Sequence, residues 1–196
     1  MAYRIITISR QYGAGGRDVS CAVAELLKIH LYDHDLSARI AEETELPLEY
    51  VESKGEYAAG RSFSSFIDRR NGNGRSLQDE IWDSEQRLIR ELAAQGEQCL
   101  FLGRSADYIL KDEPDCLHVF LYADPVIRAK RAATERGLQV PDPVKYILDR
   151  DKRRSMHCEF YTGRIWGLPE NYQLMLNTGK LDTAVCAALI AAAYRA

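Results

Sequence analysis

A run of glycines between an apolar segment and a helical pattern constrains this chain more than any other feature. Residues 3–9 are rich in β-branched side chains, and three of the four residues at positions 13–16 are glycine. Beyond residue 17 the apolar side chains recur at helical spacing, which predicts a helix over about residues 18–28. The glycine loop (residues 10–17) therefore joins a strand to a helix N-terminus, an arrangement whose N–H groups can surround an anion.

The glycine loop departs from the standard phosphate-binding motif at three positions. Arg10 lies where the motif has its first glycine, and Arg17 and Asp18 replace a lysine followed by serine or threonine. An arginine can still hold phosphate through its guanidinium fork, but a carboxylate cannot imitate a neutral hydroxyl on magnesium. Asp18 also fits the positive field of the first helical turn. The glycines alone leave open both phosphate binding and a purely structural turn.

The rest of the chain alternates short apolar runs with helical patterns. Four more strands are predicted at residues 31–32, 99–102, 117–122 and 172–176, and helices at 35–44, 76–96, 125–136, 144–157 and 181–194. Asp35 is expected to cap the first of these helices, and Ser76 the second. The alternation predicts an α/β fold with a mainly parallel five-stranded sheet flanked by helices. The Gly-, Ser- and Asn-rich residues 55–75 fit either a functional loop or a plain linker.

Composition and charge exclude several classes of protein. A net charge of −3 gives no general attraction to nucleic acid. The longest apolar stretch, near residues 184–193, is too short to span a bilayer, and we expect no signal peptide. Five scattered cysteines suggest neither a metal site nor a disulfide framework, so we expect a cytoplasmic protein.

The N-terminal segment resembles that of a known family. Residues 6–18, Ile-Thr-Ile-Ser-Arg-Gln-Tyr-Gly-Ala-Gly-Gly-Arg-Asp, resemble the signature of the cytidylate kinase-like family, a branch of the P-loop nucleoside monophosphate kinases. The resemblance continues through residues 31–33, 102–107, 123–131 and 172–178. It implies a P-loop kinase-type three-layer sandwich forming one domain over residues 1–196. Helical insertions would bind the acceptor, at about residues 33–98, and form a lid, at about 137–157.

The same resemblance implies roles for individual residues. The donor phosphates of ATP would be bound by Gly13, Ala14, Gly15, Gly16, Arg17 and Asp18. The acceptor would be bound by Asp33, Arg39, Arg104 and Asp107. Catalytic contacts would come from Arg17, Arg128, Arg131, Arg150 and Arg154. Residues 34–38 differ from the corresponding segment of true cytidylate kinases, and Ser105 replaces an aspartate, so the base specificity stays open.

The lid arginines also have a simpler explanation. Arg128 and Arg131 are three residues apart, as are Arg150 and Arg153, while Arg154 lies four residues after Arg150. Each pair fits a solvated helix face as well as a lid that closes over a transferring phosphoryl group. The four histidines, at positions 30, 34, 118 and 157, share no metal-ligand spacing and are expected to be structural, with His34 nearest the acceptor site.

The activity implied by the resemblance is phosphoryl transfer from ATP, with Mg²⁺, to a nucleoside monophosphate such as CMP or dCMP. Such a reaction depends on positioning and cationic groups more than on a strong base. Asp18, Asp33 and Asp107 are all available to magnesium, and the sequence does not choose among them. Two alternatives stay open: a nucleotide-binding or regulatory module with a degenerate loop, and a kinase of a non-nucleotide small molecule. We expect a small-molecule nucleotide as partner, and neither nucleic acid nor membrane.

Overall fold

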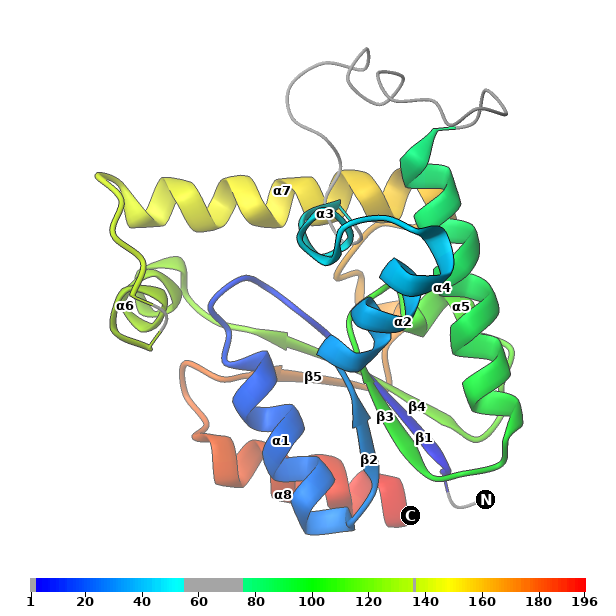
Figure 1. Ribbon diagram of the computed structural model, residues 1–196. Coiled ribbons are helices and arrows are strands. Elements are labelled where there is room, and N and C mark those ends of the chain that lie inside the picture. Colours follow the sequence, from blue (N-terminus) through cyan, green and yellow to red (C-terminus); the bar gives the residue numbers. More distant parts are fainter. Residues whose placement is uncertain (1–2, 55–75, 136) are drawn as a thin grey trace.

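Five parallel strands form the centre of the computed structural model, which describes residues 3–54, 76–135 and 137–196. The strands are β1 (Ile5–Arg10), β2 (His30–Tyr32), β3 (Cys99–Leu102), β4 (Cys116–Tyr122) and β5 (Leu174–Asn177). They pair side by side in the order β2-β3-β1-β4-β5, and every pairing is parallel (Figure 1). The predicted α/β fold is confirmed, with a sheet that is wholly rather than mainly parallel among these strands.

Helices cover both faces of the sheet, and this burial explains why the strands are nearly unbroken apolar runs. On one face lie α1 (Gly16–Leu27) and α8 (Thr183–Arg195), which pack together. On the other lie α2 (His34–Thr44), α4 (Leu77–Ala94) and α5 (Ala106–Ile109), with α3 (Leu48–Lys54) against α2. In β1, Ile6 and Ile8 face the first group, while Ile5 faces the second. The glycine loop is thereby attached to a strand buried on both sides.

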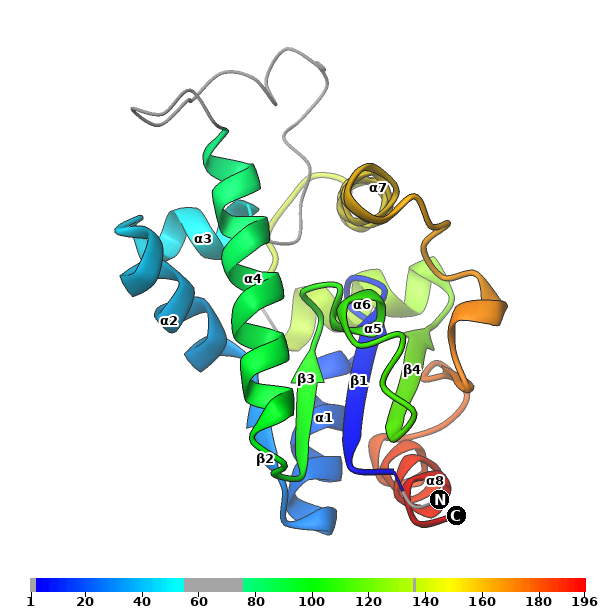
Figure 2. The same ribbon diagram turned by 90° about the vertical axis from the view of Figure 1, so that its right-hand side faces the viewer.

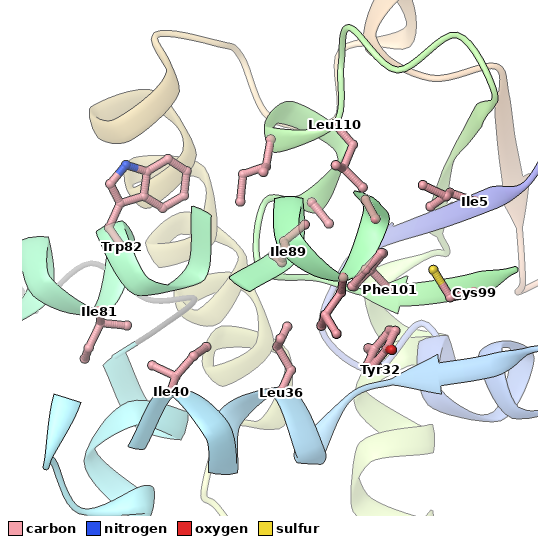
Figure 3. Close-up of a cluster of buried hydrophobic side chains, with 14 of the residues drawn as sticks. Ile5, Tyr32, Leu36, Ile40, Ile81, Trp82, Ile89, Cys99, Phe101 and Leu110 are labelled. Carbon is pink, nitrogen blue, oxygen red and sulfur yellow. The ribbon is translucent and has the colours of Figure 1, made fainter. Parts of the chain in front are cut away.

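The second face carries the larger cluster of buried side chains (Figure 3). Leu36 and Ile40 of α2 meet Ile89 of α4 there, over Phe101 of β3. This packing fixes α2 and α4 relative to the carboxyl ends of the strands, where the loops that carry the candidate site residues begin.

Two further helices lie beyond the carboxyl ends of the strands. They are α6 (Pro125–Glu135) and α7 (Pro143–Thr162), which pack against each other. Figures 1 and 2 show α7 lying across the end of the sheet at which β1 passes into the glycine loop. A short 3₁₀ turn, η2 (Pro169–Asn171), then leads toward β5.

Several predicted boundaries were wrong. Asp35 does not cap α2: Asp33 is the N-cap residue, and Oδ1 of Asp35 instead accepts hydrogen bonds from the Asp33 and Leu36 amides, both at 3.0 Å. Ser76 caps α4 as expected, accepting a bond from the Gln78 amide. Helix α3 was not predicted, α7 continues to residue 162, and β5 begins at residue 174.

Two predictions fall outside the described residues: the segment 55–75, and Arg136 as the last residue of the helix from 125. Among the helices described, none is both long and apolar enough to cross a membrane.

Candidate functional site

The glycine loop adopts a backbone that its glycines permit. Gly13 and Gly15 have φ angles of +74° and +70°, the left-handed region that other residues rarely adopt, and Gly15 is the N-cap of α1. A Cβ atom added to Gly13 would lie only 2.5 Å from the Arg128 carbonyl oxygen of α6. The loop therefore needs glycine both for its backbone conformation and for its close approach to α6.

A cavity of about 780 Å³ opens beside this loop and is called the main cavity below. It is lined by Arg10, Gln11, Tyr12, Gly13, Gly16, Arg17, Asp18, Asp33, His34, Leu102, Glu135, Arg154 and Thr183. Its volume is within the range of small-molecule and cofactor sites. Three arginines and three carboxylates share its wall, so it offers charges of both signs to a ligand.

Arg17 and Asp33 meet in the main cavity, although the sequence assigned one to the donor and the other to the acceptor. The Arg17 Nε atom lies 3.4 Å from Oδ2 of Asp33, and the Arg17 side chain is about half exposed. His34 lies beside them, with Nε2 3.8 Å from the same Asp33 oxygen and Nδ1 3.0 Å from Oε1 of Glu52. Asp18 is exposed in the first turn of α1. One residue predicted for the donor, Arg17, therefore lies beside one predicted for the acceptor, Asp33.

Arg128 is almost fully buried, with 1% of its surface exposed. Its Nη1 atom lies 2.6 Å from Oδ2 of Asp151 on α7, and it donates to the Tyr12 carbonyl oxygen at 3.0 Å. Nε donates to the carbonyl oxygen of Ala123. Arg128 is thus directed at the backbone of the glycine loop and is absent from the lining of the main cavity.

The other three predicted lid arginines occupy different environments. Arg131 donates to the carbonyl oxygens of Gly13 (3.4 Å) and Thr178 (3.0 Å). Arg154 donates to the Arg10 carbonyl oxygen at 2.9 Å and lines the main cavity. Arg150 donates to the Tyr146 hydroxyl on its own helix, at 2.7 Å. Arg131 and Arg154 contact the glycine loop directly, whereas the Arg150 contacts described lie within α7.

Arg104 follows β3 and is held by a buried carboxylate. Its Nη1 atom donates to Oε1 of Glu85 at 2.9 Å, and Nη2 donates to the Ser37 hydroxyl at 2.7 Å. Glu85 is fully buried in α4. These contacts connect β3 to α2 and α4, so Arg104 contributes to the packing of these elements as well as to the surface beside the loop.

Asp107 lies near Arg104 and accepts a hydrogen bond from the Ser9 hydroxyl at 3.0 Å. Asp107 and Arg104 line a small cavity of about 30 Å³, which shares Arg10 and Arg154 with the main cavity. A volume of this size suits about one water molecule. Arg39 is exposed on α2 and lines neither cavity.

Buried histidine and cysteine side chains also lie within the sheet, outside the lining of both cavities. Burial lowers the pKa of His118, whose Nδ1 atom is 2.8 Å from the Thr7 hydroxyl. Burial also raises the pKa of the Cys99 thiol to about 11, so it stays protonated at neutral pH. Within the described ranges, no group of three or more His, Cys, Asp or Glu side chains is arranged to hold a metal ion.

Two carboxylates that contact arginines of the candidate site, Asp151 and Glu85, were not recognised from the sequence. Asp151 contacts the Tyr12 amide and Arg128, and Glu85 contacts Arg104, yet both residues sit in charge-rich stretches typical of solvated helix faces. No local pattern distinguishes them, because their partners lie far away in the sequence.

Comparisons with known proteins agree with this architecture. A model of the cytidylate kinase-like family matches residues 5–180. No curated protein sequence matches the chain. An uncharacterized protein from Eubacterium ventriosum has a TM-score of 0.73 at 22% identity, with 97% of each chain covered.

Two kinases of known structure are also similar. A shikimate kinase from Acinetobacter baumannii, solved with shikimate, has a TM-score of 0.56 at 17% identity, covering 96% of this chain and 90% of its own. A gluconokinase from Sinorhizobium meliloti has a TM-score of 0.54 at 16% identity, covering 98% and 96%. At these identities the structures establish a shared fold only.

Proposed function

Because this chain belongs to the cytidylate kinase-like family, we propose that it transfers a phosphoryl group from ATP to a nucleoside monophosphate, CMP or dCMP. The observation that carries the proposal is the glycine loop, which opens into a cavity lined by arginines and carboxylates together. We further propose that the reaction takes place in the cytoplasm, a compartment in which five free cysteines are ordinary.

The residues of the main cavity fit a nucleotide that carries magnesium. The loop from Gly13 to Gly16 would bind the donor phosphates through its backbone N–H groups and the N-terminus of α1. Arg17 would hold phosphate oxygens through its guanidinium group. Asp18 and Asp33 both line the cavity, which suits an ion bound through one or two carboxylates and the phosphates. Magnesium would neutralise charge on the donor phosphates.

Replacing Arg17 with alanine is expected to weaken ATP binding roughly tenfold to a hundredfold, the cost of one charge-assisted hydrogen bond of about 1.5–3 kcal/mol. Calorimetric titration with ATP and magnesium measures the change. Arg90→Ala is the matched control, because Arg90 is exposed on α4 and donates to Gln86 of its own helix. Equal affinities for the two variants would remove Arg17 from the donor site.

Arginines beside the loop would stabilise charge on the transferring group. Arg131 and Arg154 contact the loop backbone, and Arg150 lies one turn before Arg154 on α7. In a loose transition state the charge is spread over the equatorial oxygens, where guanidinium groups are most effective. Arg128 would act through the loop backbone that it holds.

Turnover and ground-state binding should respond differently to the loss of these arginines. Arg131→Ala and Arg150→Ala are expected to lower kcat on the order of a hundredfold while changing ATP affinity much less, since they act mainly in the transition state. ADP release is measured with CMP or dCMP under saturating ATP and magnesium. If kcat and ATP affinity fell in the same proportion, these arginines would belong to ground-state binding.

One observation favours a second candidate, the phosphorylation of a hydroxyl group on a non-nucleotide small molecule. Arg104, the arginine expected to hold the acceptor phosphate, is engaged by Glu85 and Ser37. The acceptor side of the main cavity presents Asp33 and His34, groups that suit a hydroxyl better than a phosphate. A panel of nucleoside monophosphates, sugars and hydroxy acids in the same ADP-release assay separates the two candidates.

A further inference from the structure

We propose that Asp151 is a positioning residue, which sets the conformation of the glycine loop and couples the loop to helix α7. The inference rests on the proposed function, because it assigns Asp151 to the donor phosphate site. Asp151 was not among the residues that the sequence pattern indicated.

Both backbone polar groups of Tyr12 are bound from outside the glycine loop. Its N–H donates to Oδ1 of Asp151 at 2.7 Å, and its carbonyl oxygen accepts from Nη1 of Arg128 at 3.0 Å. The same Arg128 atom lies 2.6 Å from Oδ2 of Asp151. One carboxylate and one guanidinium group therefore fix the peptide groups on both sides of Tyr12, and with them the path of the chain into Gly13.

Burial restricts the motion of the Asp151 and Arg128 side chains and so keeps their contacts with Tyr12 in place. Arg128 is 1% exposed and Asp151 is 9% exposed, so neither group can exchange its partner for water without rearrangement. The opposite charge of Arg128 also compensates the Asp151 carboxylate, which would otherwise repel phosphate. The pair thus orients the loop without adding a net negative charge beside the donor site.

Other residues of α7 extend the contact along the helix. Arg154, one turn after Asp151, donates to the Arg10 carbonyl oxygen. The rings of Tyr146 and Tyr12 meet edge to face with centroids 5.7 Å apart. Residues on three successive turns of α7 therefore contact residues 10–12, and a ligand that stiffens the loop should also stiffen α7. Asp151 is the central contact of the three.

Inorganic tripolyphosphate serves as the probe, because it contains the donor phosphates without a base. In the parent protein it should slow amide hydrogen exchange both in residues 10–16 and in α7. Asp151→Ala should bind tripolyphosphate on the order of tenfold more weakly, and protection should no longer extend to α7. Asp149→Ala is the matched control, an exposed aspartate two residues earlier on the same helix, and should behave as the parent does.

The conservative variant separates positioning from a merely structural role. Asp151→Asn retains an acceptor oxygen for the Tyr12 amide, so it should recover part of the affinity and of the α7 protection, even if Asp151→Ala does not fold. The inference would be overturned if tripolyphosphate protected α7 fully in Asp151→Ala. It would also be overturned if Asp151→Ala folded and Asp151→Asn bound tripolyphosphate no more tightly than Asp151→Ala. If the parent protein binds tripolyphosphate but α7 gains no protection, the coupling to α7 is wrong and the donor site stands. If the parent protein binds no tripolyphosphate, both the coupling and the donor site are wrong.

Discussion

Replacing Gly13 with alanine is expected to abolish measurable ATP binding. The φ angle of +74° is unfavourable for any residue with a Cβ atom, and that atom would lie 2.5 Å from the Arg128 carbonyl oxygen. This oxygen belongs to the backbone of α6, so it cannot move aside as a flexible side chain would. Strain in the left-handed region and overpacking together cost roughly 2–5 kcal/mol. The loop should shift to relieve that strain and lose the alignment of its amides.

The Gly163→Ala variant is the control for Gly13→Ala, because it has the same unfavourable backbone conformation without the steric contact. Gly163 ends α7 with a φ angle of +67°, but an added Cβ atom there would meet nothing within 4 Å. Only the conformational cost of about 1–2 kcal/mol applies at that position. Urea unfolding and ATP titration of both variants give the comparison. Gly163→Ala should bind ATP normally, and equal losses of affinity in the two variants would show that the close approach of Gly13 to α6 does not matter for ATP binding.

Replacing Glu85 with alanine should destabilise the protein by about 3–5 kcal/mol, because it leaves a buried guanidinium group without its carboxylate. Glu85 is fully buried, and its Oε1 atom lies 2.9 Å from Nη1 of Arg104. Urea denaturation measures the change in the free energy of unfolding.

An exposed ion pair that also involves α4 provides the control. Glu43 of α2 pairs with Arg87 of α4, and both side chains are a third or more exposed. Glu43→Ala should therefore cost less than about 1 kcal/mol. A Glu85→Ala variant no less stable than Glu43→Ala would show that the Glu85–Arg104 contact contributes little to the fold.

The strands and the glycine loop could be predicted from the sequence because their signals are local. A strand buried on both faces, such as β1, must be apolar throughout, and the change to helical spacing after Gly16 marks the start of α1. The length of α7 could not be predicted in the same way. Most of its buried residues are polar or charged, among them Asp151, Arg154 and His157, so no apolar stripe marks its buried face in the sequence.

Much of the candidate site depends on contacts between distant residues. The glycines and Arg17 are contiguous, and a motif is sufficient to propose them. Arg104, by contrast, was assigned to the acceptor from the family resemblance, and the sequence gives no sign that Glu85 of α4 engages it. Asp33 and Asp35 are both of a residue type that favours the N-cap of a helix. Because β2 ends at Tyr32, the helix α2 begins directly afterwards and Asp33 takes the N-cap position.

Direct detection of the transferred phosphoryl group tests the proposed activity. The parent protein is incubated with ATP, magnesium and CMP or dCMP, and the nucleotides are separated by ion-exchange chromatography. ADP and the cytidine diphosphate should appear in equal amounts, and only when ATP and acceptor are both present. Absence of acceptor-dependent ADP across a panel of nucleoside monophosphates, with ATP still bound, would contradict the proposed activity.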